Sequence, residues 1–447
     1  SLWALHPMCV ASVAWVAERK NLVSVCFGLL SLLCYVAHRR RKEPGDARSD
    51  LSRGALYALS LALFALALSA KAAVMTLAAV LIVTDRLLDG RWTGRSLARA
   101  LPFLALAAAA ASVVSAREAH IAVATEPVDL VLRPFIAVAA LVHYVLSMLL
   151  PMDRALIYPR WAESLALPRY WWSLALAVAA LVAAWRYRNW LGEPWFWGMA
   201  LFGLTVSPVL GFMHFAWIQF AFVSDHYLYL GGAGITLAVV LMGDHWRRML
   251  REKQAKPDSA SVNTVFAAVV VVALAALSWQ TVALAATWRN NVTLYEHTLK
   301  ISPTADVPLV NLGNHYYRTG DYATALSYYS EWARVSPGFV RAKLSSARSL
   351  IQLGRPDEAV AYFEAALETA RDRVAARSAV REEYARYLRR LGRLDAAFAQ
   401  YRILLEENPR KHRQLERVIS GLSAELERGE AMGPGATVAP DRSDAER

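Results

Sequence analysis

Long runs of apolar residues fill the first two thirds of the chain, and short charged blocks separate them. A helix needs about 20 apolar residues, or about 17 at the short end, to cross a bilayer core about 30 Å thick. The pattern predicts membrane-length helices at residues 22–38, 54–70, 72–88, 101–116, 133–150, 171–186, 195–211, 228–243 and 263–286. From Thr287 onward the sequence is polar and helix-forming, which indicates a separate domain.

The basic blocks between the apolar runs predict the orientation of these helices. Lys and Arg gather in cytoplasmic loops of membrane proteins, so we expect four blocks to be cytoplasmic, at residues 38–53, 86–99, 186–194 and 244–258. The four assignments agree only if residues 133–150 do not cross the membrane. We therefore predict that this segment is re-entrant or lies along the outer surface, beside an outward-facing cavity lined by residues 117–170. The last helix then leads outward.

Composition and charge support the same class of protein. The chain is 56% hydrophobic and 19% charged, too apolar for a soluble protein of 447 residues. Its net charge of +12 lies in the loop blocks, which argues against a nucleic-acid partner. The three cysteines, Cys9, Cys26 and Cys34, cluster near the first apolar run and form no disulfide framework. The sequence has no Gly-rich phosphate loop, nucleophile elbow or metal-ligand spacing, so it predicts no metal site in this chain.

A repeat occupies the polar part of the chain. "LGNHYYRTGDYATALSYYSEWARVSP" (312–337) aligns with "SARSLIQLGRPDEAVAYFEAALETAR" (346–371), and Gly320 and Gly354 are 34 residues apart. A third copy lies at 384–409. Small residues where two helices cross, aromatic residues between them and a closing Pro are typical of tetratricopeptide repeats (TPRs). About three repeats suffice for a stable solenoid.

These patterns predict an all-α chain, a polytopic membrane helical domain followed by a TPR α-solenoid. We place the membrane domain at residues 1–286, the TPR domain at 287–428 and a disordered Gly/Pro/Ala-rich tail at 429–447. The opening "SLWAL" resembles the end of a helix and follows no charged segment. We therefore expect that the N-terminal helices of the membrane domain lie upstream of Ser1.

Five stretches of the sequence carry a family resemblance, and they cover nearly the whole chain in order. They are "LHPMCVASVAWVAERKNLVSVCFGLLSLLCYV" (5–36), "SAKAAVMTLAAVLIVTDRLL" (69–88), "MDRALIYPRW" (152–161), "SDHYLYL" (224–230) and "TWRNNVTLYEHTLKISP" (287–303). Together they resemble the bacterial relatives of the transmembrane and tetratricopeptide-repeat-containing O-mannosyltransferases, which belong to the C-type glycosyltransferase superfamily.

The resemblance implies an integral-membrane enzyme of the bacterial inner membrane with a periplasmic TPR domain. Such an enzyme moves a sugar from a polyprenyl-phosphate carrier to Ser or Thr hydroxyls of a protein acceptor bound by the TPRs. Its partners are the lipid bilayer, the polyprenyl-phosphate-linked sugar and the acceptor protein, and not nucleic acid. The family's acidic catalytic loop falls upstream of Ser1, so the catalytic residue is unassigned here. No cofactor is expected in this chain, although a divalent cation could be held through that upstream loop.

The chemistry of sugar transfer selects candidate residues. An acceptor hydroxyl needs a carboxylate base, and the departing phosphate needs cationic or hydrogen-bonding groups. Asp225, which lies between aromatic residues at a helix end, is the candidate base in this chain. The candidates for binding the substrate are His6, Glu18, Arg19, Lys20, Lys71, His226 and Tyr227. Arg133, Tyr144 and Tyr158 border the predicted cavity and are further candidates.

Simpler interpretations stay open for these residues. Glu18, Arg19 and Lys20 are also typical of charges that anchor a helix end at the membrane interface. The sequence departs from the family pattern where relatives carry Glu (here Ala11), Arg (Cys9 and His226) and Pro (Ala72). The guanidinium of Arg donates two parallel hydrogen bonds to one carboxylate or phosphate, which His and Cys cannot do. The alternative is therefore a catalytically inactive, membrane-anchored TPR scaffold. A transporter is a third class, disfavoured because no inverted repeat is apparent.

Overall fold

The computed structural model describes residues 2–40, 47–121, 128–150, 153–162, 164–211, 221–253, 259–408 and 411–432. Within these ranges the regular elements are helices, as the apolar pattern and the repeat predict. The chain divides into two compact units, Ser1–Pro303 and Thr304–Arg447. The predicted disordered tail falls mostly outside the described residues, and so do residues 122–127 of the predicted outward-facing cavity.

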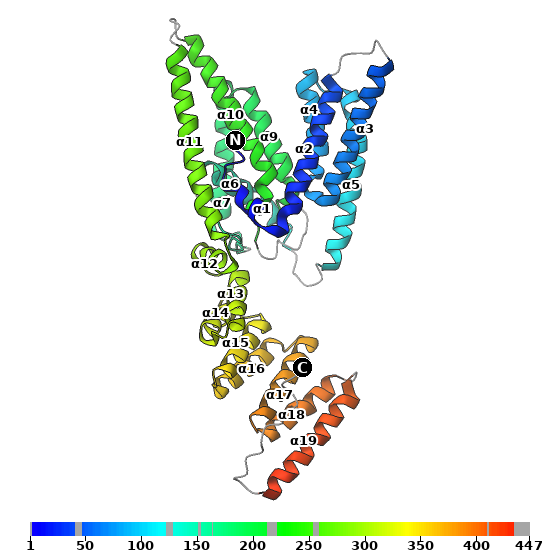
Figure 1. Ribbon diagram of the computed structural model, residues 1–447, viewed down its shortest axis with the longest axis vertical. Helices are drawn as coiled ribbons and strands as arrows, with labels where there is room; N and C mark the ends of the chain where they lie inside the picture. Colours follow the sequence, from blue (N-terminus) through cyan, green and yellow to red (C-terminus); the bar gives the residue numbers. More distant parts are fainter. Residues whose placement is uncertain are drawn as a thin grey trace. The chain divides into compact units, whose positions relative to one another are not determined.

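Long apolar helices form most of the first unit (Figure 1). Its α-helices are α1 (Cys9–Ala14), α2 (Arg19–Arg40), α3 (Ala47–Ala70), α4 (Leu77–Asp89), α5 (Gly94–Ile121), α6 (Arg133–Leu149), α7 (Pro168–Arg186), α8 (Arg188–Leu191), α9 (Glu193–Val206), α10 (Leu228–Lys253), α11 (Ser259–Thr287) and α12 (Asn291–Ile301). Short 3₁₀ turns lie between them, η1 (Val16–Glu18), η2 (Ala72–Thr76), η4 (Ser207–Val209) and η6 (Asp225–Tyr227). Each apolar run of the sequence therefore corresponds to a helix, although the run at 72–88 begins as a 3₁₀ turn.

Five helices are long and apolar enough to cross a membrane by length and composition. They are Val16–Arg40, Ser52–Ala70, Gly94–Arg117, Asp225–Leu250 and Asn263–Thr287. The segment predicted to stay on one side of the membrane forms α6, an apolar helix of only 17 residues. That length is at the lower limit for a spanning helix.

Glycines allow α9 and α10 to pack with their backbones in contact. A Cβ added at Gly198 would lie 2.6 Å from the backbone nitrogen of Ala238, and one at Gly234 would lie 2.5 Å from the nitrogen of Phe202. Real side chains do not approach backbone atoms so closely, so both positions require glycine for this packing. Close helix contacts through small residues are typical of packing inside membranes.

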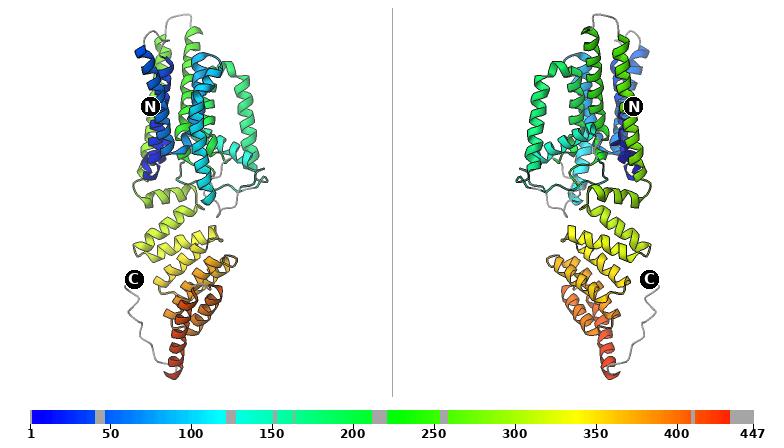
Figure 2. Two further views of the ribbon diagram at one scale, coloured as in Figure 1. Left: turned by 90° about the vertical axis from the view of Figure 1, so that its right-hand side faces the viewer. Right: turned by 90° about the vertical axis from the view of Figure 1, so that its left-hand side faces the viewer.

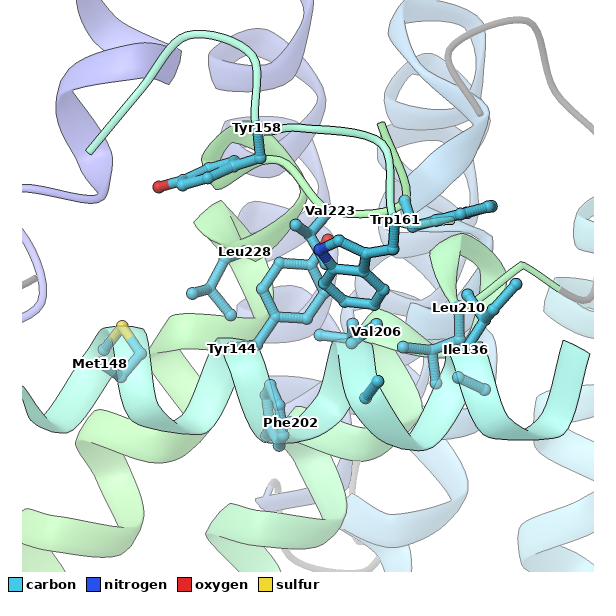
Figure 3. Close-up of a cluster of buried hydrophobic side chains, with 14 of the residues drawn as sticks. Ile136, Tyr144, Met148, Tyr158, Trp161, Phe202, Val206, Leu210, Val223 and Leu228 are labelled. Carbon is cyan, nitrogen blue, oxygen red and sulfur yellow. The ribbon is translucent and has the colours of Figure 1, made fainter. Parts of the chain in front are cut away.

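Two apolar clusters hold the first unit together. One joins α2, α3, α4 and α5 through side chains such as Tyr35, Phe64 and Phe103, which are almost fully buried. The other joins α6, α9 and α10 with the segments before α7 and α10, and Figure 3 shows Tyr144 and Trp161 within it. The candidate site lies beside this second cluster.

The second unit consists of antiparallel helix pairs (Figure 2). They are α13 (Asp306–Arg318) with α14 (Tyr322–Val335), α15 (Val340–Gln352) with α16 (Pro356–Thr369), and α17 (Val374–Arg390) with α18 (Leu394–Glu407), followed by α19 (His412–Met432). Ala325, Ala359 and Ala397, the small residues of the repeat, are fully buried. The turn glycines of the three repeats, Gly320, Gly354 and Gly392, all have positive φ. The described helices thus follow the predicted repeat.

The helix before the repeats belongs to the first unit. α12 lies within the predicted TPR range, 287–428, yet the two compact units divide after Pro303. Ile301 of α12 packs against the apolar cluster of α6 and α10. The predicted boundary follows the change of composition near Thr287, and composition does not report which core a helix joins.

Candidate functional site

Five buried ionisable side chains gather where the start of the chain meets η6 and the segment after α6. His6, Glu18, Arg154, Asp225 and His226 are each no more than 6% exposed. Burying a charge is costly unless a partner of opposite charge or a hydrogen bond compensates. The contacts of these groups therefore define the site.

The first ion pair joins two predicted candidates from distant parts of the sequence. Lys71 Nζ lies 2.7 Å from Glu18 Oε2, and Lys20 Nζ lies 3.4 Å from Glu18 Oε1. Lys71 has an extended backbone between α3 and η2, which separates the two elements. Burial lowers the pKa of Lys71, and the nearby Glu18 carboxylate opposes this shift only in part. Arg19 does not join the pair, because it is exposed and its Nε donates to the carbonyl of Val16.

The second ion pair fixes Asp225. Arg154 Nη1 lies 3.4 Å from Asp225 Oδ2, and the hydroxyl of Tyr158 donates to Asp225 Oδ1 at 3.0 Å. Burial and the adjacent Asp225 carboxylate raise the pKa of Tyr158 well above its usual value, so the phenol stays protonated as a donor. Figure 3 shows Tyr158 at the edge of the apolar cluster that contains Tyr144.

Arg154 is the residue that the sequence interpretation missed. It lies in the stretch "MDRALIYPRW", but no spacing rule distinguishes it from its neighbours. Its Nη2 donates to the carbonyl of Ser147, whereas Nε and Nη1 have no hydrogen-bond acceptor among the described residues. A buried guanidinium with unused donors next to a carboxylate is a functional-site signal that only packing reveals.

The two histidines of the site make structural contacts. His226 Nδ1 lies 2.7 Å from the hydroxyl of Ser224, and the His226 carbonyl accepts from Asn21 Nδ2 at 2.9 Å. The ring of Tyr227 packs against the ring of His226, with centroids 4.2 Å apart. These contacts fix η6 against the start of α2.

His6 is held on the other side of the site. Its Nε2 lies 3.2 Å from the carbonyl of Met148. Burial, helped by the charge of Arg154, lowers the pKa of His6 to about 4, so this histidine is neutral at pH 7. A neutral ring that donates to Met148 joins the start of the chain to the end of α6.

The chemical capacity of the site follows from these contacts. The site has two carboxylates, one buried cation (Arg154) and one half-buried cation (Lys71), but each carboxylate is already paired with a cation. The described residues contain no group of three His, Cys, Asp or Glu side chains placed to hold a metal ion. A divalent cation therefore does not fit the described residues of this chain.

The match to a known protein family concerns the second unit. The tetratricopeptide repeat family model matches residues 310–374 and 344–412. Among solved structures, the P58(IPK) TPR domain is 14% identical, with 85% of this chain and 96% of that chain covered and a TM-score of 0.24. Yeast Tom70 is 12% identical, with 90% and 89% covered and a TM-score of 0.19. A search of curated proteins finds no match to this sequence. The family match and the helix pairs agree, and residues 310–412 are tetratricopeptide repeats.

Proposed function

We propose that this chain is an integral-membrane glycosyltransferase that moves a sugar from a polyprenyl-phosphate carrier to a Ser or Thr hydroxyl of a protein. The TPR unit binds the acceptor protein, since TPR domains generally mediate protein–protein interaction. Apolar helices hold the first unit in the bacterial inner membrane, and the eight predicted crossings other than residues 133–150 lead the chain to the periplasmic side, where the TPR unit lies.

One observation carries this proposal. Four stretches of the family resemblance, far apart in the sequence, supply the residues that meet in the buried site. Residues 5–36 supply Glu18, residues 69–88 supply Lys71, residues 152–161 supply Arg154, and residues 224–230 supply Asp225. Two buried ion pairs built from such separate stretches favour a common site over unrelated surface charges.

Sugar transfer requires a base and cations, and the charged side chains of the site can serve as both. The acceptor hydroxyl loses its proton to a carboxylate, and Asp225 is the candidate within the described residues. The acceptor oxygen forms a bond to the sugar carbon as the bond from that carbon to the phosphate oxygen breaks. The departing polyprenyl phosphate takes the electron pair, and Arg154 and Lys71 are the cations available to stabilise it. Substrate must displace one partner of each ion pair for these groups to act.

A second candidate function is the inactive membrane-anchored scaffold, and the burial of the site favours it. Glu18 and Asp225 are only 4% and 3% exposed, which restricts their access to an acceptor. Cys9 and Ala11, which replace charged residues of the family pattern, are buried in the same region. In the scaffold, the ion pairs join helices and the TPR unit alone performs the function.

Transfer of radiolabelled sugar from polyprenyl-phosphate donors to acceptor protein, with the full chain in detergent, distinguishes the two. We expect Asp225→Asn to lower transfer by about tenfold or more, or about 1.4 kcal/mol of transition-state stabilisation. Asp89→Asn is the matched control, since Asp89 is also paired with an arginine, Arg39, but lies outside the site. Folded protein that transfers no sugar from any donor, yet still captures a protein, supports the scaffold. Equal activity in both variants removes Asp225 from the mechanism.

A further inference from the structure

An arginine-rich cluster lies at the end of the first unit where α2 and α4 finish and α3 and α5 begin (Figure 1). Residues 38–53 and 85–99, which cover these helix ends, carry ten Lys and Arg against five Asp and Glu. The two ranges correspond to the first two basic blocks that the sequence predicts to be cytoplasmic. An excess of positive charge is therefore concentrated at one predicted membrane interface.

Two arginines of the cluster already have a partner. The buried carboxylate of Asp85 accepts from Arg39 Nε at 2.8 Å and from Arg99 Nη2 at 2.7 Å. The hydroxyl of Tyr35 donates to the same carboxylate at 3.0 Å. Asp85 thus occupies both guanidiniums and holds the ends of α2, α4 and α5 together.

Arg53, near the start of the ordered part of α3, is different. Its backbone carbonyl lies 3.0 Å from Nδ1 of His38 on α2, which fixes its position. Its Nε is buried without a hydrogen-bond partner, and no carboxylate among the described residues pairs with its guanidinium. The charges of Arg39 and Arg99 act on the same histidine as that of Arg53, so the three guanidiniums are close together. A buried donor without an acceptor is costly unless a ligand satisfies it.

The helices beside Arg53 present apolar side chains to their surroundings. Leu59 and Leu66 of α3 and Leu101 of α5 are 49%, 51% and 61% exposed. Arg53 is the second residue of the candidate span Ser52–Ala70, so it lies where that span meets the predicted cytoplasmic interface. A ligand at this position would meet a cation at the interface and apolar surface toward the bilayer core.

We propose that Arg53 binds the phosphate of an anionic phospholipid, such as phosphatidylglycerol, at the predicted cytoplasmic ends of α2, α3, α4 and α5. A guanidinium pairs with a phosphate through two parallel hydrogen bonds, and the acyl chains lie along the exposed leucines. An anionic headgroup offsets the excess positive charge of the cluster, which a zwitterionic headgroup does not. The inference goes beyond the proposed function and does not depend on sugar transfer.

Lipid retention by the full chain tests the site. The chain is immobilised in detergent, equilibrated with micelles that contain equal amounts of phosphatidylglycerol and phosphatidylcholine with the same acyl chains, and washed. Mass spectrometry then measures the retained lipids. We expect about tenfold or more phosphatidylglycerol than phosphatidylcholine. Equal retention of the two lipids would overturn the inference.

Two substitutions at Arg53 locate the preference. Arg53→Gln should lower the ratio of retained phosphatidylglycerol to phosphatidylcholine by about fivefold or more, because the phosphate loses its charged donor. Arg53→Lys keeps the charge without the two parallel hydrogen bonds, so its ratio should lie between those of Arg53→Gln and the unmodified chain. Circular dichroism checks that the helices are intact. If Arg53→Gln does not fold, the Arg53→Lys ratio decides, and a ratio equal to that of the unmodified chain would contradict the site.

The matched control is Arg188→Gln. It makes the same charge change at an exposed position of α8, in another block that is predicted to be cytoplasmic. Its lipid ratio should stay within about twofold of the unmodified chain, since a distant exposed charge is screened by salt. Equal losses in Arg53→Gln and Arg188→Gln would mean general attraction to a basic surface and overturn the inference.

A wash with inorganic phosphate, compared with chloride at the same ionic strength, distinguishes a lipid headgroup from a soluble phosphate. The two washes should release equal amounts of phosphatidylglycerol. Release that is about fivefold greater with phosphate would assign the site to a soluble phosphate and overturn the lipid. A chain that retains phosphatidylglycerol but transfers no sugar contradicts the transferase alone, and one that transfers sugar without this lipid preference contradicts this inference alone.

Discussion

The two units distribute charged and apolar side chains in opposite ways. In the first unit, Asp85 is fully buried and accepts from Arg39 and Arg99, whereas Trp172 and Trp279 are 72% and 79% exposed. In the second unit, Leu350 and Phe363 are fully buried, and pairs such as Arg355 with Glu358 are on the surface. In α11, no residue of the most apolar stretch is buried inside the protein. An apolar helix without a protein partner needs a nonaqueous environment, so this contrast favours a bilayer around the first unit only.

The contrast also concerns the strength of ion pairs. An exposed pair in water contributes at most about 1 kcal/mol, because solvent and salt screen it. Removal of one partner from a buried pair leaves an uncompensated charge and costs about 3 to 5 kcal/mol. Loss of one ion-pair partner is therefore expected to cost more stability in the first unit than in the second.

The largest expected effect is at Asp85. Asp85→Ala should lower the free energy of unfolding of the first unit by about 3 to 5 kcal/mol, because Arg39 and Arg99 lose their buried carboxylate. Tryptophan fluorescence in denaturant measures this, since Trp332 is the one tryptophan of the second unit. Glu358→Ala, which breaks the exposed pair with Arg355, should change stability by less than about 1 kcal/mol. Equal effects would show that Asp85 is not desolvated.

The next effect is a pH dependence confined to the first unit. The pKa of His6 is lowered to about 4 in the folded chain, so the unfolded chain binds the proton more tightly. The stability that neutral His6 provides is therefore complete above about pH 6.5 and is lost as the pH falls toward about 4. We expect a loss of about 2 kcal/mol across this window from His6.

The control for this prediction is His6→Gln, which retains a donor for the Met148 carbonyl but does not titrate. Denaturant midpoints of the two proteins at pH 7.5 and about pH 4.5 should diverge at the lower value, with the variant less affected. Parallel curves would assign the acid sensitivity to other groups.

Close helix packing gives an intermediate effect. Gly198→Ala should destabilise the α9–α10 contact by about 1 to 3 kcal/mol, because the new methyl group would meet the backbone of Ala238. Gly203→Ala on the same helix has open space around it, so it should be neutral or stabilising by up to about 1 kcal/mol. Denaturant unfolding of both variants decides whether the glycine is needed for contact or only tolerated.

The smallest effect is expected in a turn of the TPR unit. Gly320 has a φ of 85°, so Gly320→Ala forces a left-handed conformation that costs about 1 to 2 kcal/mol. Gly338→Ala is the control, since Gly338 has no positive φ and no atom within 4 Å of an added Cβ. Unfolding of the second unit, followed by circular dichroism, should separate the two variants. A smaller loss of stability for Gly320→Ala than for Gly198→Ala would agree with the expected order of these effects.

The helices and the repeat follow from the amino-acid sequence alone. The length of an apolar run and the spacing of Ala325, Ala359 and Ala397 are local properties, and each predicts a helix or a helix crossing without reference to the rest of the chain. The candidate residues Glu18, Lys71 and Asp225 also follow from the sequence, because they are ionisable side chains in stretches that carry the family resemblance. Their roles in substrate binding stay predictions.

The pairing of the charged side chains depends on the fold of the whole chain. Glu18 and Lys71 are 53 residues apart, and Tyr158 and Asp225 are 67 apart, so no helical or strand spacing relates them. No sequence feature distinguishes Arg154 from other loop arginines, yet the fold places it beside Asp225. Composition groups α12 with the repeats, whereas its Ile301 packs against an apolar cluster of the first unit. The physical reason is that helix formation depends on neighbouring residues, whereas ion pairing and burial depend on distances between segments, which packing alone determines.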